Sequence, residues 1–369
     1  MSKPILFDQV AINDYAKKNK IQPFRVKQIF YEIFKNQNIK LDEITTLSKD
    51  LRSDLEKHFD ILSLEINEIL EDSQTTKIWF KTHDGHIIEA VIIYHRSKYP
   101  KPLTKDYWLL TNLNRITLCI SSQIGCPLNC LFCVTGKMWI KRNLTRDEII
   151  SQILVANNIV KNKFWKKEDW TLRAVRNVVF MWMWEPLLNY DEVKKSIEIM
   201  LAQDRLSLSR RHVTISTAGI IDGIKKLIKD KIEVKLAISL HCADQEIREK
   251  LMPIAKTQKL NDLMKVIDEY VKATDNRIFY EYIMIKDITD KPELANKLAN
   301  LLKNRLAHVN LIAYNKNPMI NLQESSIKTI REFQDILEKK WITVTIRDSM
   351  WRSVKSSCWQ LGYEAVVRK

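Results

Sequence analysis

Gly125-Cys126-Pro127-Leu128-Asn129-Cys130-Leu131-Phe132-Cys133 is the stretch that organises this chain of 369 residues. Three of the six cysteines fall within it, spaced Cys-x3-Cys-x2-Cys, directly after an apolar run that begins at Arg115. Soft thiolate ligands this close together select zinc or an iron–sulfur cluster. A structural zinc ion or an ordinary cubane cluster needs four protein ligands. Three cysteines in one loop, with no fourth nearby, therefore predict a [4Fe–4S] cluster held by Cys126, Cys130 and Cys133, with one iron left open. A zinc knuckle with a distant fourth ligand and three unrelated buried thiols are the alternatives.

The overall composition is that of a globular protein, with 45% hydrophobic and 28% charged residues. No run approaches the 18 apolar residues of a membrane span, and the first residues do not resemble a secretory signal. We therefore expect a cytoplasmic protein whose thiols serve a cofactor rather than disulfides. The net charge of +15 favours a polyanionic partner such as nucleic acid, although a solvated lysine-rich surface is the alternative.

Residues 1–95 predict a small N-terminal accessory domain. Helices are expected at 13–20, from Pro23 onwards and after the N-cap residue Ser48, and strands are expected at 61–70, 77–81 and 86–95. The helices carry a basic face that suits RNA but is equally explained as a solvated surface: Lys17, Lys18, Lys20, Arg25 and Lys27. In the third strand Glu89 lies in an apolar run. It is either an outward-facing charge, which is the commoner case, or a buried carboxylate suited to proton transfer.

From Arg115 onwards strands and helices alternate. Strands are predicted at 115–121, 175–181, 212–216, 234–240, 278–285, 308–313 and 342–347. Six successive strand–helix units predict an α/β fold, a partial (β/α)6 barrel over 112–347, with the helical accessory domain and a β-hairpin linker region before it. A C-terminal segment, 348–369, carries Cys358. Barrel chemistry lies at the C-terminal ends of the strands, and the cysteine loop, Glu185, Ser216, Ser239 to His241 and Asn315 all fall there.

A Cys-x3-Cys-x2-Cys loop after the first strand of such a barrel resembles the radical SAM superfamily. In that superfamily the open iron chelates S-adenosylmethionine (SAM), and reductive cleavage yields a 5′-deoxyadenosyl radical. Five segments resemble the RlmN family more closely: CISSQIGC from Cys119, KRNLT from Lys141, EPLLN from Glu185, AISLH from Ala237 and SCWQL from Ser357. The segment PFRVKQIF from Pro23 resembles that family's accessory domain, so the resemblance spans nearly the whole chain. It implies methylation of adenosine C2 in 23S rRNA, and often in tRNA too.

The resemblance also implies roles for individual residues. Cys358 accepts a methyl group from one SAM, and the radical from a second SAM takes a hydrogen from that S-methyl group. The carbon radical then adds to the base. Cys119 resolves the resulting RNA–protein adduct by forming a disulfide with Cys358, and Glu89 removes the C2 proton. The positions that match SAM contacts are Trp184, Glu185, Ser216, Ser239, Leu240, His241 and Asn315. Cys242 matches no family role, and we interpret it as structural.

The expected partners are 23S rRNA and tRNA, together with a one-electron donor of the flavodoxin or ferredoxin type. We expect a monomer without membrane contacts. Two alternatives remain at this stage. One is a relative that methylates adenine C8 with the same cysteines, against which the N-terminal domain argues. The other is an inactive iron–sulfur protein that binds RNA.

The tryptophans conflict with this assignment. Average usage would give roughly 26 glycines in a chain of this length, whereas it has 6 glycines and 10 tryptophans. Six of the tryptophans fall where the family has glycine: Trp139, Trp182, Trp184, Trp341, Trp351 and Trp359. Our hypothesis is that these positions are UGA codons read as tryptophan in a genome that decodes UGA as glycine. UGG codons at positions 182, 184, 351 and 359 would refute it and would favour a degenerate enzyme.

Overall fold

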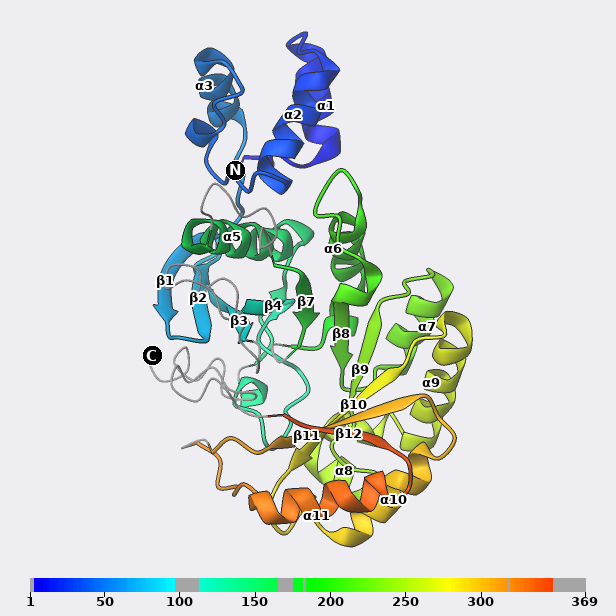
Figure 1. Cartoon of the computed structure of the whole chain (residues 1–369). Coiled ribbons are helices and arrows are strands. Elements are labelled where there is room, and N and C mark those ends of the chain that lie inside the picture. Colours follow the sequence, from blue (N-terminus) through cyan, green and yellow to red (C-terminus); the bar gives the residue numbers. More distant parts are fainter. Residues whose placement is uncertain are drawn as a thin grey trace.

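One ten-stranded sheet forms the centre of the molecule (Figure 1). This computed structural model describes residues 3–96, 113–137, 139–164, 175–181, 184–316 and 319–347; Cys358, Trp182, Trp351 and Trp359 lie outside them. Seven strands run parallel in chain order: β4 (Leu113–Cys119), β7 (Asn177–Phe180), β8 (Val213–Thr217), β9 (Lys235–Ser239), β10 (Ile278–Met284), β11 (Ala307–Ala313) and β12 (Thr343–Arg347). Among the described strands β12 pairs only with β11, so the sheet does not close over this part of the chain, and the predicted partial barrel is confirmed.

The helices between these strands cover the outer face of the curved sheet (Figure 1). They are α5 (Arg146–Phe164), α6 (Tyr190–Leu201), α7 (Ile221–Lys229), α8 (Gln245–Leu251), α9 (Leu260–Thr274), α10 (Pro292–Leu302) and α11 (Ile327–Glu338). Each lays an apolar stripe on the strands, as α9 does with Leu263, Ile267 and Tyr270, all fully buried. Within the described residues no helix is long and apolar enough to cross a membrane.

Three antiparallel strands extend the sheet beyond β4: β1 (Glu65–Glu71), β2 (Thr75–Lys81) and β3 (Ile87–Arg96). The predicted hairpin is confirmed, with Gly85 at φ 82° in its turn, although β1 begins later than predicted. The three strands predicted within the N-terminal domain and its β-hairpin region are therefore hydrogen-bonded into the barrel sheet. In the β3–β4 pair Val91 lies opposite Cys119, so β3 forms one wall of the barrel interior.

The N-terminal helices form a separate layer at one end of the barrel (Figure 1). They are α1 (Gln9–Lys18), α2 (Pro23–Phe34) and α3 (Lys49–His58). The first prediction, 13–20, was wrong because Asp8 caps the helix earlier, accepting hydrogen bonds from the backbone N–H groups of Val10 (3.0 Å) and Ala11 (2.9 Å). Ser48 caps α3 as predicted, at 3.3 Å from the nitrogen of Leu51.

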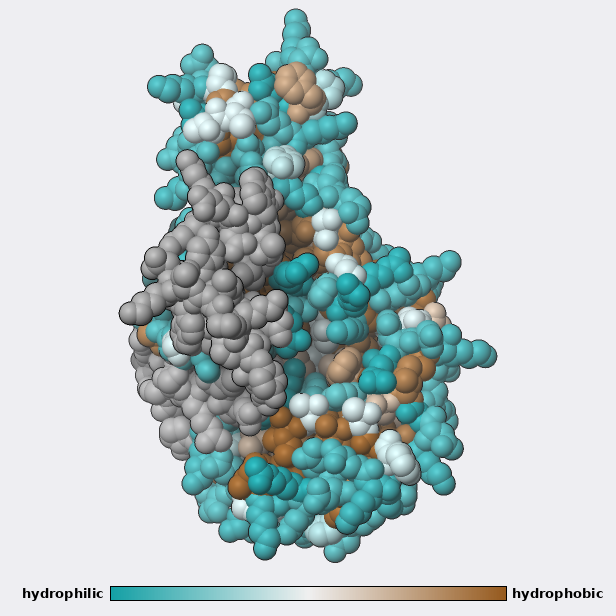
Figure 2. All heavy atoms as spheres, viewed as in Figure 1, coloured by the Kyte–Doolittle hydropathy of each residue, from teal (hydrophilic) through white to brown (hydrophobic). Residues whose placement is uncertain are grey.

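Polar contacts and one stacked guanidinium join this layer to the barrel helices. Lys161 on α5 donates hydrogen bonds to the carbonyl of Asn36 and the amide oxygen of Asn38, both at 2.7 Å. Arg205, after α6, stacks 3.8 Å from the ring centroid of Phe30. In Figure 2 hydrophilic residues predominate over these helices, while hydrophobic patches occur on the barrel.

Candidate active site

The cysteine loop is closed at its base by a short antiparallel ribbon of β5 (Gln123–Ile124) and β6 (Arg142–Asn143). Gly125 enters the loop at φ 80°, and a Cβ there would lie 2.1 Å from the backbone oxygen of Trp139. Only glycine fits this close approach.

Burial raises the pKa of all three loop thiols, to about 12 for Cys126. The thiols also raise one another's pKa, so they lie close enough to interact. Among the described residues no group of three His, Cys, Asp or Glu side chains is arranged to hold a single metal ion. In a cubane cluster each thiolate binds a different iron, so this finding concerns a single ion and not a cluster. A buried, mutually repelling set of sulfur donors fits an iron–sulfur cluster, which binds thiolates.

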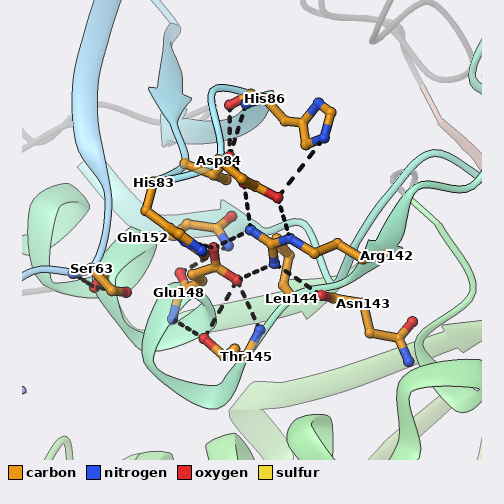
Figure 3. A network of polar contacts seen from close by, with 12 residues as sticks. Ser63, His83, Asp84, His86, Arg142, Asn143, Leu144, Thr145, Glu148 and Gln152 are labelled. Atoms are coloured by element: carbon orange, nitrogen blue, oxygen red, sulfur yellow. Dashed lines mark hydrogen bonds and ion pairs between the residues drawn. The ribbon is translucent and has the colours of Figure 1, made fainter. Parts of the chain in front are cut away.

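An arginine clasp, centred on Arg142, fastens the returning strand of the loop (Figure 3). Its guanidinium makes two hydrogen bonds to Asp84 in the β2–β3 turn, at 2.7 and 2.9 Å, and two to Glu148, at 2.8 and 2.7 Å. Glu148 also accepts a hydrogen bond from the backbone nitrogen of Thr145, at 2.9 Å, and its own backbone N–H donates to the Thr145 hydroxyl, which forms a capping box at the start of α5. These bidentate pairs hold the hairpin, the loop and α5 together.

The predicted SAM-binding residues line the C-terminal ends of successive strands. Glu185 is 2% exposed and accepts hydrogen bonds from the backbone N–H groups of Leu187 (3.1 Å) and Ala218 (2.6 Å). Burial raises its pKa to about 7, so a bound cation would restore its charged form. Its charge in turn raises the pKa of Cys126 and Cys130, which places it beside the loop.

Asn315 is buried after β11, and neither its amide nitrogen nor its amide oxygen has a partner among the described residues. Buried amides without partners are costly, so a bound polar ligand is the natural partner. The ring of His241 packs edge-on against Phe132 of the cysteine loop, 4.8 Å between centroids. Ser216 is the second-last residue of β8, Ser239 ends β9, and Leu240 directly follows Ser239. This side of the barrel fits SAM.

Trp184 does not fit a position that contacts SAM. Its φ is 83°, a backbone conformation that a bulky residue adopts only under strain. Its indole packs against the barrel-interior cluster that contains Val91 and Cys119, and its indole nitrogen is buried without a partner among the described residues. A glycine would relieve the strain and vacate the space. The expected conflict at this position is therefore present in the structure.

The two described residues with proposed chemical roles lie on neighbouring strands. Cys119 is a free thiol, 1% exposed, and donates to the carbonyl oxygen of Met181 at 2.6 Å. Burial raises its pKa to about 12. Glu89 is 2% exposed, so it is a buried carboxylate and not the outward-facing charge that is the commoner case. Its side chain leaves β3 on the same face as Val91, which packs with Cys119.

The sequence did not reveal what holds Glu89 in place. Lys77 on β2 places its ammonium nitrogen 3.2 Å from one carboxylate oxygen, and Trp79 donates its indole N–H to the other at 3.2 Å. Both partners are buried. The only feature of the sequence that could have indicated this ion pair is the presence of one lysine and one carboxylate in two neighbouring apolar strands. Trp79 thus has the role of a genuine tryptophan.

The barrel, its cysteine loop and the polar strand ends define a radical SAM enzyme. Residues 120–298 match the family model described as "Radical SAM superfamily". A radical SAM methyltransferase from Sphaerobacter thermophilus has the same fold, with a TM-score of 0.85 and 29% identity over 97% of this chain and 98% of that one.

The curated relatives narrow the class. A probable dual-specificity RNA methyltransferase RlmN from Aquifex aeolicus is 38% identical over 92% of this chain and 91% of the relative. The Nautilia profundicola dual-specificity RNA methyltransferase RlmN is 36% identical over 92% and 93%. The chain therefore belongs to the RlmN family and is a radical SAM RNA methyltransferase. The family implies a [4Fe–4S] cluster and SAM as cofactors.

Proposed function

We propose that this enzyme methylates C2 of adenosine in 23S rRNA and in tRNA through an S-methylcysteine at Cys358, with two SAM molecules per cycle. The observation that carries the proposal is that Glu89 and Cys119 face the same side of the sheet, with Val91, two residues from Glu89, directly opposite Cys119. One is a buried carboxylate and the other a buried thiol, and they lie on the same face of adjacent strands β3 and β4. The folded N-terminal layer and the full-length similarity to RlmN relatives favour C2 over C8.

In this proposal Cys126, Cys130 and Cys133 would hold the cluster. When bound, it would supply the electron for reductive cleavage of SAM. Glu185 and Asn315 would orient SAM with their buried polar atoms. Among the described residues the Glu185 carboxylate forms no ion pair, and neither side-chain polar atom of Asn315 has a hydrogen-bond partner.

The remaining steps use the chain's own side chains. The Cys358 thiol loses its proton and gains a methyl group. The methyl group then loses one hydrogen atom, and the resulting carbon radical adds to C2 of the base. The adduct gives up one electron to the oxidised one-electron carrier and gives up its C2 proton to the Glu89 carboxylate. The Cys119 sulfur, after losing its proton, attacks the Cys358 sulfur and forms a disulfide. The carbon–sulfur bond breaks, and the freed carbon gains a proton to become the methyl group on C2. Cys119 is 1% exposed, so its thiol is shielded from solvent until it attacks the Cys358 sulfur.

The test is mass spectrometry of nucleosides from rRNA and tRNA of a bacterial strain without adenine C2 methylation. The strain expresses the protein with glycine at the six tryptophan positions that match family glycines. 2-Methyladenosine is expected, and Cys358→Ala and Glu89→Gln should abolish it. Cys242→Ala, at a buried cysteine outside the proposed chemistry, is the matched control and should retain it. 8-Methyladenosine would instead identify the C8-methylating relative.

A second function is favoured by one observation, the position of Trp184. If the tryptophan is genuine, its indole occupies the barrel interior, and the protein is a cluster-containing RNA-binding protein without methyl transfer. Ultraviolet–visible spectra of the anaerobically reconstituted chain distinguish the two. A cluster absorption that changes on addition of SAM supports the enzyme, and an unresponsive cluster in both the tryptophan and the glycine forms supports the binder.

A further inference from the structure

Arg248 on α8 carries a charge in the protein interior. It is 0% exposed and is one of the largest fully buried side chains of the described residues. Its guanidinium donates three hydrogen bonds to backbone carbonyls: to Ala218 at 2.7 Å, and to Leu240 and Gln258 at 3.2 Å each. The donors are satisfied, but carbonyl dipoles do not neutralise a full charge.

No carboxylate in the described part of the chain forms an ion pair with Arg248. A buried cation without a counter-ion is strongly unfavourable, and proteins retain such groups when an anion is bound beside them. Burial lowers the pKa of Arg248 to about 10, and the anionic forms of Cys130 and Cys242 are the groups that raise it. Of these two, Cys130 is a proposed cluster ligand.

The helix of Arg248 is joined directly to the cysteine loop. The backbone N–H of Leu131, the residue after Cys130, donates to the carbonyl of Leu251 at the end of α8, at 2.8 Å. Two of the three carbonyls that hold the guanidinium belong to Ala218, directly after β8, and Leu240, directly after β9. These strand ends carry proposed SAM-binding residues. Arg248 is therefore hydrogen-bonded to the proposed SAM-binding loops and lies on a helix that contacts the cysteine loop.

We infer that Arg248 is the counter-ion of the iron–sulfur cluster, a positioning residue that raises the cluster's reduction potential. The inference rests on the proposed cluster site. Three thiolates make the site negatively charged, and one-electron reduction adds one more negative charge. A fixed buried cation stabilises the reduced state more than the oxidised state, because net charge is one of the properties that set the potential of such clusters. A purely structural brace would need the donors of the side chain but not its charge.

The test is an anaerobic redox titration of the reconstituted full-length protein, followed by electron paramagnetic resonance of the reduced cluster. Arg248→Met should lower the ratio of reduced to oxidised cluster at least tenfold at a fixed potential, which is 59 mV for a one-electron couple. Arg248→Lys, which keeps the charge, should restore most of it. Lys250→Met removes an exposed charge from the same helix and should leave the potential unchanged.

Each outcome is decisive. If the wild-type protein takes up no cluster, the proposed cluster site itself fails. If the wild-type and Met variants load equally and share one potential, the cluster site stands and Arg248 is only a brace. If the Met variant does not load, iron uptake is compared for Arg248→Lys, which keeps the charge, and Arg248→Gln, which keeps a hydrogen-bond donor. Higher uptake in the Lys variant supports the inference, and equal uptake overturns it.

Discussion

Replacing Trp341 by glycine is expected to stabilise the protein by about 1 kcal/mol. Trp341 follows α11, where its backbone N–H donates to Glu338 at 2.9 Å and that of Ile342 donates to Leu337 at 3.1 Å. This pair of bonds defines a Schellman motif, in which the residue at the position of Trp341 is left-handed and usually glycine. Its φ is indeed 63°.

The magnitude follows from two opposing effects. A residue with a Cβ in the left-handed region costs roughly 1–2 kcal/mol, and glycine gives back about 0.5–1 kcal/mol through the greater freedom of its unfolded chain. The indole is 95% exposed, so its removal forfeits almost no packing. The net gain of about 1 kcal/mol corresponds to a rise of about 2 °C in the midpoint of thermal unfolding.

Thermal unfolding of the cofactor-free protein measures the effect. Lys231→Gly is the matched positive control, because Lys231 has φ 55° and ends α7 with the same pair of bonds. Lys340→Gly is the negative control: its φ is not positive, so glycine there should lower stability by about 0.5–1 kcal/mol. A gain for Lys231→Gly without one for Trp341→Gly would refute the reasoning, and a UGG codon at position 341 would remove glycine as the native residue.

Three further predictions concern the site. Burial raises the pKa of Glu185 to about 7, so its carboxylate becomes protonated as the pH falls below neutrality. SAM carries an ammonium group and should then bind about tenfold more weakly for each pH unit, as measured by equilibrium dialysis. Glu185→Gln should show no such dependence, and a flat wild-type profile would contradict the role. Lys77→Met leaves the Glu89 carboxylate buried without its cation and should destabilise the protein by about 3–5 kcal/mol in denaturant unfolding. Lys77→Arg should lose far less, and equal losses would show that the charge is irrelevant. Cys119→Ala should accumulate protein crosslinked to RNA on denaturing gels, whereas Cys119→Ala combined with Cys358→Ala should not; no crosslink in the single variant would argue against the resolving role.

The barrel was predictable because its signals are local. Each parallel strand is a short apolar run followed by an amphipathic helix, and such patterns need no knowledge of distant contacts. The cysteine spacing and Gly125 were local as well. The error in α1 arose because one capping carboxylate, Asp8, outweighed the apolar pattern further along.

The sequence by itself determined the partial barrel, the three-cysteine loop and the strand ends that carry Glu185 and Asn315. Only the tertiary structure decided that Glu89 is buried beside Lys77, and that Arg248 is fully buried on the helix that contacts the cysteine loop. An alternating strand pattern predicts two faces of a strand but does not indicate which face is buried. The partner of a charged side chain is known only when residues far apart in the chain are brought together by folding. The same holds for Trp184 and Trp341. The shortage of glycine and the excess of tryptophan in the chain suggested that some tryptophans stand for glycine. The left-handed backbones of Trp184 and Trp341 supplied the physical argument.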